Sequence, residues 1–217
     1  MKQKVEIRFE KREALRFISH HDLMRAVARA VRRAALPVRL SEGFNPRPRI
    51  VFPVALEVGV VSLDEAAEIE FTQCLSTQEV LARLSSVFHP ALALKAVKNL
   101  PLRRAARIPI RIRYRLHLKE AEIQVEPLPL QELLRAETLP FSRPREKRIQ
   151  KVDLKPALLD ASAGDEGDLW VDVRPGPKGS VRPLEVLSLL LHTPLSKLKH
   201  VRITKVLMEL SEPLTRP

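Results

Sequence analysis

The segment that most constrains the fold is residues 110–119, in which apolar or aromatic side chains alternate with basic ones without a break. A period of two residues is typical of a β-strand, whose successive side chains point to opposite faces of a sheet. One face of this strand would be apolar, and the other would carry Arg111, Arg113, Arg115, His117 and Lys119. The pattern therefore requires a sheet with one buried face and one open face, and we expect helices to cover the apolar one.

Strand and helix patterns follow one another in a similar order in both halves of the chain. The first half shows a strand over 5–9, a helix from Ser19 to Pro37, extended pieces at 38–40 and 50–55, a strand over 67–71, a helix from Ser76 and an extended segment over 91–97. The second half shows strands over 108–119, 148–154, 169–173 and 201–210, with helices over 128–136 and 183–191.

This order predicts an α+β protein with antiparallel sheets, built from two ferredoxin-like (βαββαβ) units in tandem. We place the N-terminal unit at residues 1–104 and the C-terminal unit at residues 105–217. A single mixed sheet with the same elements is the alternative.

The chain is strongly basic, with 38 Lys and Arg residues against 26 Asp and Glu residues and a formal net charge of +12. Such an excess indicates a phosphate-bearing partner or an anionic membrane surface. No apolar run reaches the roughly 18 residues that a membrane span needs, and no signal peptide is evident, so we expect a cytoplasmic protein that does not enter a membrane. Cys74 is the single cysteine; it excludes an internal disulfide, and we expect it in the core.

Two regions are candidate RNA contacts. The first is the basic strand face, where Arg111, Arg113 and Arg115 are spaced about 6.6 Å apart along the strand and could follow successive phosphates. The alternative is a solvated face whose charge is balanced by acids on neighbouring strands, for which the candidates are Glu6, Glu68 and Glu209.

The second region combines a helix and a loop. Asp22, Arg25, Arg29 and Arg32 recur at three- and four-residue steps with Arg33 beside them, which places a basic stripe on the first helix. In the loop over 41–49, Gly43 gives backbone freedom and two prolines stiffen the chain. Nucleic acid and an acidic protein surface would both suit the stripe. The contacts that we predict in this region are Arg25, Arg32, Asn45, Arg47 and Arg49. Aromatic residues make up only 4% of the chain, which favours recognition of backbone and shape over stacking on bases.

His20 is the single candidate for catalysis. It stands at the start of the first helix, where the helix dipole disfavours a charged imidazole and so leaves a ring that could act as a general base. The alternative is that His20 packs or forms hydrogen bonds locally. The sequence contains no C-x-x-C pair, H-E-x-x-H motif, Walker loop or dinucleotide-binding glycine pattern, so we predict no metal site and no cofactor.

The segments Arg16-Phe17-Ile18-Ser19-His20-His21-Asp22-Leu23-Met24-Arg25, Arg32-Arg33-Ala34 and Ser41-Glu42-Gly43-Phe44-Asn45-Pro46-Arg47-Pro48-Arg49 resemble the radical SAM-linked protein family, a bacterial domain of unknown function. The resemblance covers about the first third of the chain, and a later segment, 182–187, agrees with it. It implies a companion of a cobalamin-binding radical SAM protein, encoded beside that protein or fused to its C-terminus, often near genes for ribosomal proteins and a ribonuclease.

The chain departs from the family pattern at two positions, because His21 replaces a leucine and Arg47 replaces a histidine. A position that accepts arginine suits a phosphate contact better than a proton shuttle, which favours binding over catalysis in that loop. One cysteine cannot hold a radical SAM iron–sulfur cluster, so a partner would carry out any radical chemistry.

The sequence therefore predicts an RNA-binding accessory protein that presents a structured RNA, ribosomal or transfer RNA, to a radical SAM enzyme and has no catalytic activity of its own. Two alternatives stay open. One is a metal-independent RNA-processing endonuclease with His20 as general base and Arg16 or Arg25 stabilising the transition state. The other is a protein adaptor for the radical SAM enzyme that binds no nucleic acid.

Overall fold

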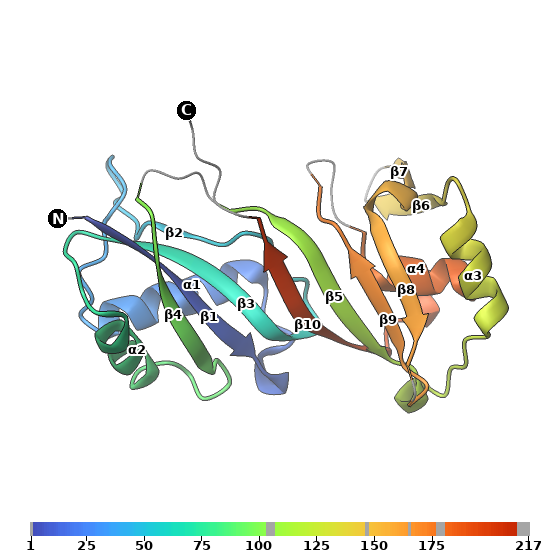
Figure 1. Cartoon of the computed structure of the whole chain (residues 1–217), viewed down its shortest axis with the longest axis horizontal. Coiled ribbons are helices and arrows are strands. Elements are labelled where there is room, and N and C mark those ends of the chain that lie inside the picture. Colours follow the sequence, from blue (N-terminus) through green and yellow to red (C-terminus); the bar gives the residue numbers. More distant parts are fainter. Residues whose placement is uncertain (1, 103–106, 146–147, 165, 177–180, 212–217) are drawn as a thin grey trace. The chain divides into compact units, whose positions relative to one another are not determined.

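The computed structural model describes residues 2–102, 107–145, 148–164, 166–176 and 181–211 (Figure 1). The chain divides into two compact units. The second unit is Pro109–Glu209, and the first comprises the residues before it together with Leu210 and Ser211. The expected boundary between residues 104 and 105 lies outside the described residues; along the chain, the first unit passes into the second between Ile108 and Pro109.

The first unit contains four strands and two α-helices among its described residues. Both helices begin where the sequence predicted, after the capping residues Ser19 and Ser76, whose hydroxyls accept hydrogen bonds from backbone N–H groups in the first turn. In chain order the elements are β1 (Gln3–Lys11), the 3-10 turn η1 (Glu13–Leu15), α1 (His20–Arg33), β2 (Ile50–Val51), β3 (Val60–Phe71), α2 (Thr77–Ser85) and β4 (Leu94–Leu100).

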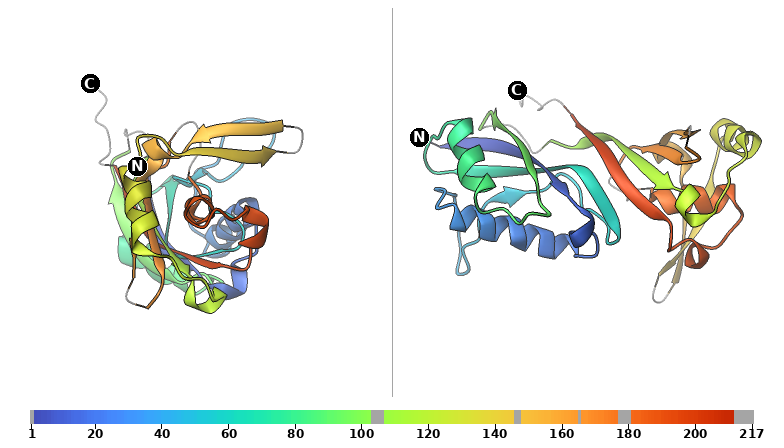
Figure 2. Two further views of the ribbon diagram at one scale, coloured as in Figure 1. Left: turned by 90° about the vertical axis from the view of Figure 1, so that its right-hand side faces the viewer. Right: turned by 90° about the horizontal axis from the view of Figure 1, so that it is seen from below.

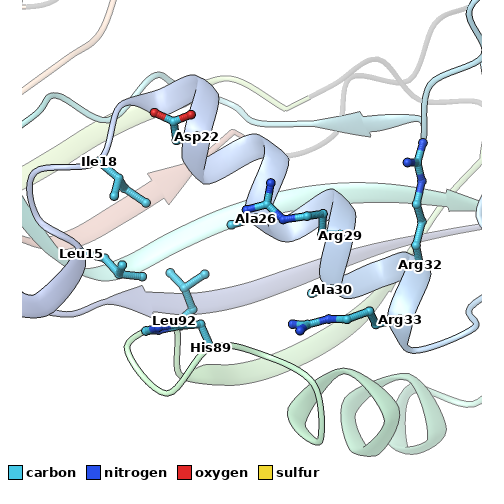
Figure 3. A pocket seen from close by; sticks show the side chains of 10 residues that line it. All are labelled: Leu15, Ile18, Asp22, Ala26, Arg29, Ala30, Arg32, Arg33, His89 and Leu92. Atoms are coloured by element: carbon cyan, nitrogen blue, oxygen red, sulfur yellow. The ribbon is translucent and has the colours of Figure 1, made fainter.

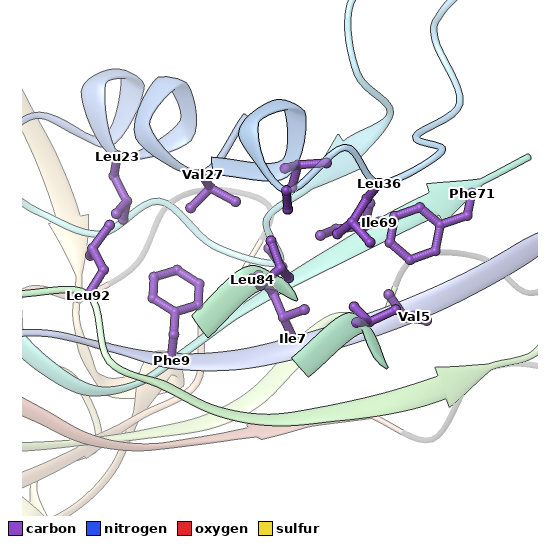
Figure 4. Close-up of a cluster of buried hydrophobic side chains, with 14 residues drawn as sticks. Val5, Ile7, Phe9, Leu23, Val27, Leu36, Ile69, Phe71, Leu84 and Leu92 are labelled. Atoms are coloured by element: carbon purple, nitrogen blue, oxygen red, sulfur yellow. The ribbon is translucent and has the colours of Figure 1, made fainter. Parts of the chain in front are cut away.

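The strands of the first unit lie in the order β4-β1-β3-β2, and neighbouring strands are antiparallel. Both helices pack on one face of this sheet, and the core lies between them and the strands (Figure 4). The buried side chains alternate along the strands and recur on one side of each helix, as the two periods require. They include Val5, Ile7 and Phe9 of β1, Ile69 and Phe71 of β3, Leu23, Val27 and Val31 of α1, and Val80 and Leu84 of α2.

The opposite face of β1 and β3 carries an ion-pair network. Glu68 pairs with Lys4 at 2.5 Å and with Arg107 at 3.5 Å, and Glu6 pairs with Arg8 at 3.1 Å and with Arg107. Glu6 and Glu68 were candidates to balance the basic strand over 110–119. The structure pairs both of them with cations of their own unit.

The second unit contains six strands and two α-helices among its described residues. Pro127 and Pro183 begin the helices, because proline at the first helical position has no N–H group to leave unpaired. In chain order the elements are β5 (Pro109–His117), η2 (Lys119–Ala121), α3 (Pro127–Arg135), β6 (Pro140–Arg145), β7 (Arg148–Asp153), η3 (Lys155–Ala157), β8 (Leu158–Ala163), β9 (Leu169–Val173), α4 (Pro183–Leu190), η4 (Leu195–Lys197) and β10 (Arg202–Leu210).

The main strands of the second unit follow the order β10-β5-β9-β8, while β6 and β7 form a separate two-stranded ribbon (Figure 2). The sequence predicted a strand over 148–154 within the C-terminal ferredoxin-like unit and no strand over 140–145. The strand is confirmed as β7, but it pairs with β6 in the separate ribbon and not with the main sheet. Proline is tolerated in β6 because each strand of a two-stranded ribbon has a free edge. A buried ion pair between Arg143 of β6 and Glu185 of α4, with Nε–Oε1 at 2.6 Å, attaches the ribbon to the unit.

The predicted α+β class is confirmed. If the β6–β7 ribbon is set aside, the strands of each unit lie in the order fourth, first, third, second. The tandem ferredoxin-like plan itself stays a prediction, and the strand order that the two units share is consistent with it.

Two further expectations concern burial and the membrane. Cys74 is exposed, so its expected place in the core is wrong. It lies three residues after Phe71, the last residue of β3, where the alternation of the strand no longer decides which side chains are buried. Among the described residues, no helix has the length and apolar character needed to cross a membrane.

Candidate functional site

The candidate site lies on the outer side of α1 and in the segment that follows it. Leu23 and Val27 are buried against the sheet, while Arg25, Arg29 and Arg32 are exposed. We call these three residues the arginine ridge. The buried and exposed residues lie on different faces of α1, because residues three and four positions apart share one face of a helix.

The first turn of α1 is held by a reciprocal cap. Ser19 Oγ accepts a hydrogen bond from the backbone N–H of Asp22 at 3.1 Å and donates one to Asp22 Oδ2 at 2.7 Å. This hydrogen bond and the charge of Arg25, whose guanidinium is 3.3 Å from Oδ1, lower the pKa of Asp22. Asp22 is therefore ionised at neutral pH. It partly offsets the charge of Arg25 but pairs with neither of the other two ridge arginines.

The loop over 41–49 brings Arg47 to the ridge. The backbone N–H of Ser41 donates to the carbonyl of Arg47 at 2.8 Å, and the N–H of Arg47 donates to Ser41 Oγ at 3.0 Å. Leu40 and Pro48 form an isolated β-bridge at the base of the loop. Gly43 has a φ of 117°, which residues with a side chain rarely adopt, and Phe44 beside it is fully exposed.

A hollow of about 450 Å³ lies between α1 and this loop, and we call it the loop-side hollow. Its lining holds the whole ridge together with Arg47, and it contains no acidic residue. The other residues that line it are His21, Met24, Ala28, Pro48, Ile50 and Phe52. Within the described part of the chain, no carboxylate lies within ion-pair distance of Arg29, Arg32 or Arg47.

A second hollow of about 480 Å³ lies on the other side of the same helix, and we call it the opposite hollow (Figure 3). Arg29 and Arg32 line both hollows. In Figure 3, Arg33 points toward His89, and Arg32 points away to the other side of the helix. The rest of the lining is Leu15, Ile18, Asp22, Ala26, Ala30 and Leu92.

The structure gathers only part of the predicted helix-and-loop region. Arg25, Arg32 and Arg47 line the loop-side hollow together. Asn45 is exposed in the loop but does not line the hollow, and Arg49 lies 3.9 Å from Glu70, which also pairs with Arg39 at 3.0 Å.

Sequence reasoning did not select Arg29 as a contact, although the helical period put it in the stripe. It also gave no signal for the apolar walls of the loop-side hollow. Met24 and Ala28 on α1, and Ile50 and Phe52 after the loop, have the composition of ordinary core residues. Only the packing of the loop beside the helix shows that they border an open space.

The basic strand face lies in the second unit on β5, and carboxylates pair with its arginines. Arg111 Nε is 2.9 Å from Asp172 Oδ2, and Arg113 Nε is 2.8 Å from Asp172 Oδ1. Arg115 pairs with Glu166 at 2.6 Å and with Asp168. These contacts agree with the alternative to RNA binding, in which acids on neighbouring segments balance the charge of the strand face.

Further groups around β5 limit its positive charge. Glu209, one of the acids that the sequence suggested, lies 3.4 Å from Arg111. His117 Nε2 is 2.9 Å from Thr204 Oγ1, and burial, followed by the nearby charge of Arg202, lowers the pKa of His117. Its imidazole is therefore neutral at pH 7. The acid at position 172 could have been found from the sequence, because it alternates with apolar residues in the strand over 169–173.

His20 is the first residue of α1, and its half-buried ring packs edge-on against Phe52 with centroids 5.4 Å apart. This is the local packing that stood as the alternative to a catalytic role. Of the arginines suggested as its partners, Arg16 pairs with Glu13 at 2.6 Å and Arg25 pairs with Asp22. Within the described residues, no group of three or more His, Cys, Asp or Glu side chains is placed to hold a metal ion.

The model of one protein family, described as an uncharacterized protein conserved in bacteria (DUF2344), matches residues 4–183. The chain belongs to this family. The match includes α1, the loop over 41–49 and β5, so both candidate contact regions lie within the family domain. No curated protein shows a significant match to the chain.

Proposed function

We propose that this protein binds structured RNA through the arginine ridge and Arg47, and that it presents this RNA to a radical SAM enzyme. The observation that carries the proposal is the convergence of Arg29, Arg32 and Arg47 on one hollow, since no carboxylate of the described residues lies within ion-pair distance of these three. Like charges held together repel one another, and a bound phosphate relieves that repulsion.

Arginine suits phosphate recognition because its planar guanidinium can form two parallel hydrogen bonds to phosphate oxygens. The ridge residues are three and four positions apart, which corresponds to about 4.5 and 6 Å along the helix axis. A helix with this spacing can contact several phosphates of one strand at once. The net charge of +12 adds a long-range attraction that brings a polyanion to this surface.

The role beside a radical SAM enzyme rests on the resemblance of residues 16–49 to the radical SAM-linked proteins. Those residues contain most of the proposed binding surface, including the ridge and Arg47. With a single cysteine, the chain cannot ligate an iron–sulfur cluster by itself, so its contribution to such a reaction would be to hold the substrate.

The test is the salt dependence of RNA binding. Fluorescence anisotropy with labelled transfer RNA and ribosomal RNA hairpins gives the slope of log affinity against log salt. The variant Arg29→Gln/Arg32→Gln/Arg47→Gln should flatten this slope by about two to three units, because each lost phosphate contact removes close to one unit. A matched control with the same change of net charge is Arg135→Gln/Lys151→Gln/Lys199→Gln, which alters three exposed cations of the second unit.

A second variant examines the strand face. Neutralising Arg111, Arg113 and Arg115 should change the slope by less than the ridge variant does, because each of these arginines already pairs with a carboxylate. If the β5 variant changed the slope more than the ridge variant did, β5 would be the RNA interface. If the wild-type protein binds a purified radical SAM partner but no RNA at any salt concentration, the adaptor function replaces the one proposed.

A further inference from the structure

The loop-side hollow has a feature that phosphate binding alone does not require. Its walls are apolar, with Met24 and Ala28 on the helix side and Ile50 and Phe52 on the other, while the arginines are its cations. Its volume of about 450 Å³ falls in the range of small-molecule sites, roughly 300 to 1,000 Å³. A backbone phosphate contacts arginines at a surface and needs no such space.

We propose that this hollow holds one unstacked nucleotide, with its base against Phe52, Met24 and Ile50 and its phosphate on Arg32 and Arg47. This inference rests on the proposed function and specifies the RNA as one with an unpaired nucleotide. A nucleobase has apolar faces and polar edges, so it fits an apolar wall with an aromatic ring in it. Arginines beside that wall supply the complement to the attached phosphate.

Contacts within the protein hold the walls of the loop-side hollow. The two hydrogen bonds between Ser41 and Arg47 and the bridge from Leu40 to Pro48 fix the loop. Pro46 and Pro48 restrict its backbone further. A site that needs little ordering loses less entropy on binding, so more of the contact energy remains as affinity.

Phe52 is also fixed in position. Its ring packs edge-on against Phe9 of the core, with centroids 6.4 Å apart, and against His20. His20 therefore acts as a packing partner of the aromatic wall in this arrangement. The role explains a histidine at the helix start without assigning it a proton transfer.

The opposite hollow is of similar size but suits a nucleotide less well. It contains no Phe, Tyr or Trp, and Asp22, which is ionised, is part of its lining. A carboxylate there would repel a phosphate. This contrast supplies a matched control on the same helix, because Ala26 lines the opposite hollow, whereas Ala28 lines the loop-side hollow, and both are half-buried.

The experiment compares two labelled RNA hairpins that differ only by one bulged nucleotide. The wild-type protein should bind the bulged hairpin about tenfold more tightly or better, since stacking of one base corresponds to roughly 5- to 150-fold in affinity. Ala28→Leu should fill the loop-side hollow and remove the difference in affinity between the two hairpins when both are measured on that variant. Ala26→Leu should keep the preference. Circular dichroism checks that both variants fold.

Equal binding of the two hairpins by the wild-type protein would overturn the inference without any variant, and would leave the proposed RNA function standing. A preference that survives Ala28→Leu would also overturn it, because the base would then bind elsewhere.

A free nucleotide offers the same base and phosphate, so AMP and UMP are titrated separately by calorimetry. If neither hairpin binds, the proposed function fails; AMP or UMP binding that Ala28→Leu blocks would then support the hollow as a site for a free nucleotide. If neither RNA nor nucleotide binds, both proposals fail.

Discussion

Asp172 is the residue whose removal most directly tests the account of the basic strand. Its side chain is 3% exposed, and it accepts hydrogen bonds from Arg111 and from Arg113, whose side chains are 34% and 37% exposed. The change Asp172→Asn keeps the shape of the side chain and removes its charge. The two arginines would then face each other across a neutral amide, with a weaker acceptor between them.

The free energy of unfolding that Asp172→Asn removes lies between two known limits. Removing one partner of a fully buried pair costs about 3 to 5 kcal/mol, and removing one from an exposed pair costs about 0 to 1 kcal/mol. Because the carboxylate is buried and both guanidinium groups are about one-third exposed, we expect a loss of about 2 kcal/mol in the free energy of unfolding. For a unit of this size, about 100 residues, that corresponds to a fall in Tm of roughly 8 to 16 °C.

The pH dependence gives a second reading of the same contact. Burial raises the pKa of Asp172, but the hydrogen bonds from Arg113 and Arg111 and their charges outweigh it, so the pKa in the folded protein is lowered. A lowered pKa contributes stability that is present above the unfolded-state value, about 3.9, and is lost as the pH falls through the folded-state value. The stability difference between wild type and Asp172→Asn should therefore be constant near pH 7 and shrink below about pH 4.

Thermal and urea unfolding of the two proteins measure these quantities. Asp160→Asn is the control, since Asp160 is exposed on the neighbouring strand β8 and forms no ion pair within the described residues. It should change stability by less than about 0.5 kcal/mol. An Asp172→Asn protein as stable as the wild type would refute the view that the β5 arginines are primarily paired within the sheet and would return them to the RNA interface.

Two further predictions concern α1 and its loop. His20→Ala should lower Tm and weaken RNA binding, because the variant loses the packing of the imidazole on Phe52. We expect no RNA cleavage by either protein. If a metal-free assay gave a 2′,3′-cyclic phosphate product, formed about 10²- to 10⁴-fold more slowly by the variant, the protein would be an endonuclease. Asn45→Ala/Arg47→Ala should leave Tm within a few degrees of wild type and impair RNA binding, since both side chains are exposed; a large fall in Tm with normal binding would show that the loop is structural.

The sequence predicted the helices and the strands β1, β5 and β10 through their periods, but of the longest strand, β3, it predicted only the last part, 67–71. Alternation over 5–9 and 110–117 corresponds to β1 and β5, and the caps at Ser19 and Ser76 mark the starts of α1 and α2. These are local signals, because the backbone geometry that buries one face is set within the segment itself. The α+β class followed from the order of such segments.

The short strands of the second unit were beyond the reach of such signals. In β8, only Leu158 and Ala161 are buried, and the pairing with β9 shifts register between Leu158 and Asp160, so the two-residue period is broken. Pro140 and Pro144 in β6 indicate a loop when they are considered alone. Proline is acceptable there because, among the described residues, β6 has a paired strand on one side only.

The sequence also determined which residues are basic and that α1 would carry a cationic stripe, since charge and helical period are both local. Tertiary structure decided which of those charges stay unpaired. Arg111 and Arg113 pair with Asp172, about 60 positions later in the chain, because β5 pairs with β9. Arg32 and Arg47 line the same hollow because the loop after α1 folds back beside the helix, and among the described residues no carboxylate lies within ion-pair distance of either. Whether a cation is available to a ligand depends on what pairs with it in space, and such long-range pairing is set by the packing of whole elements and not by the local sequence.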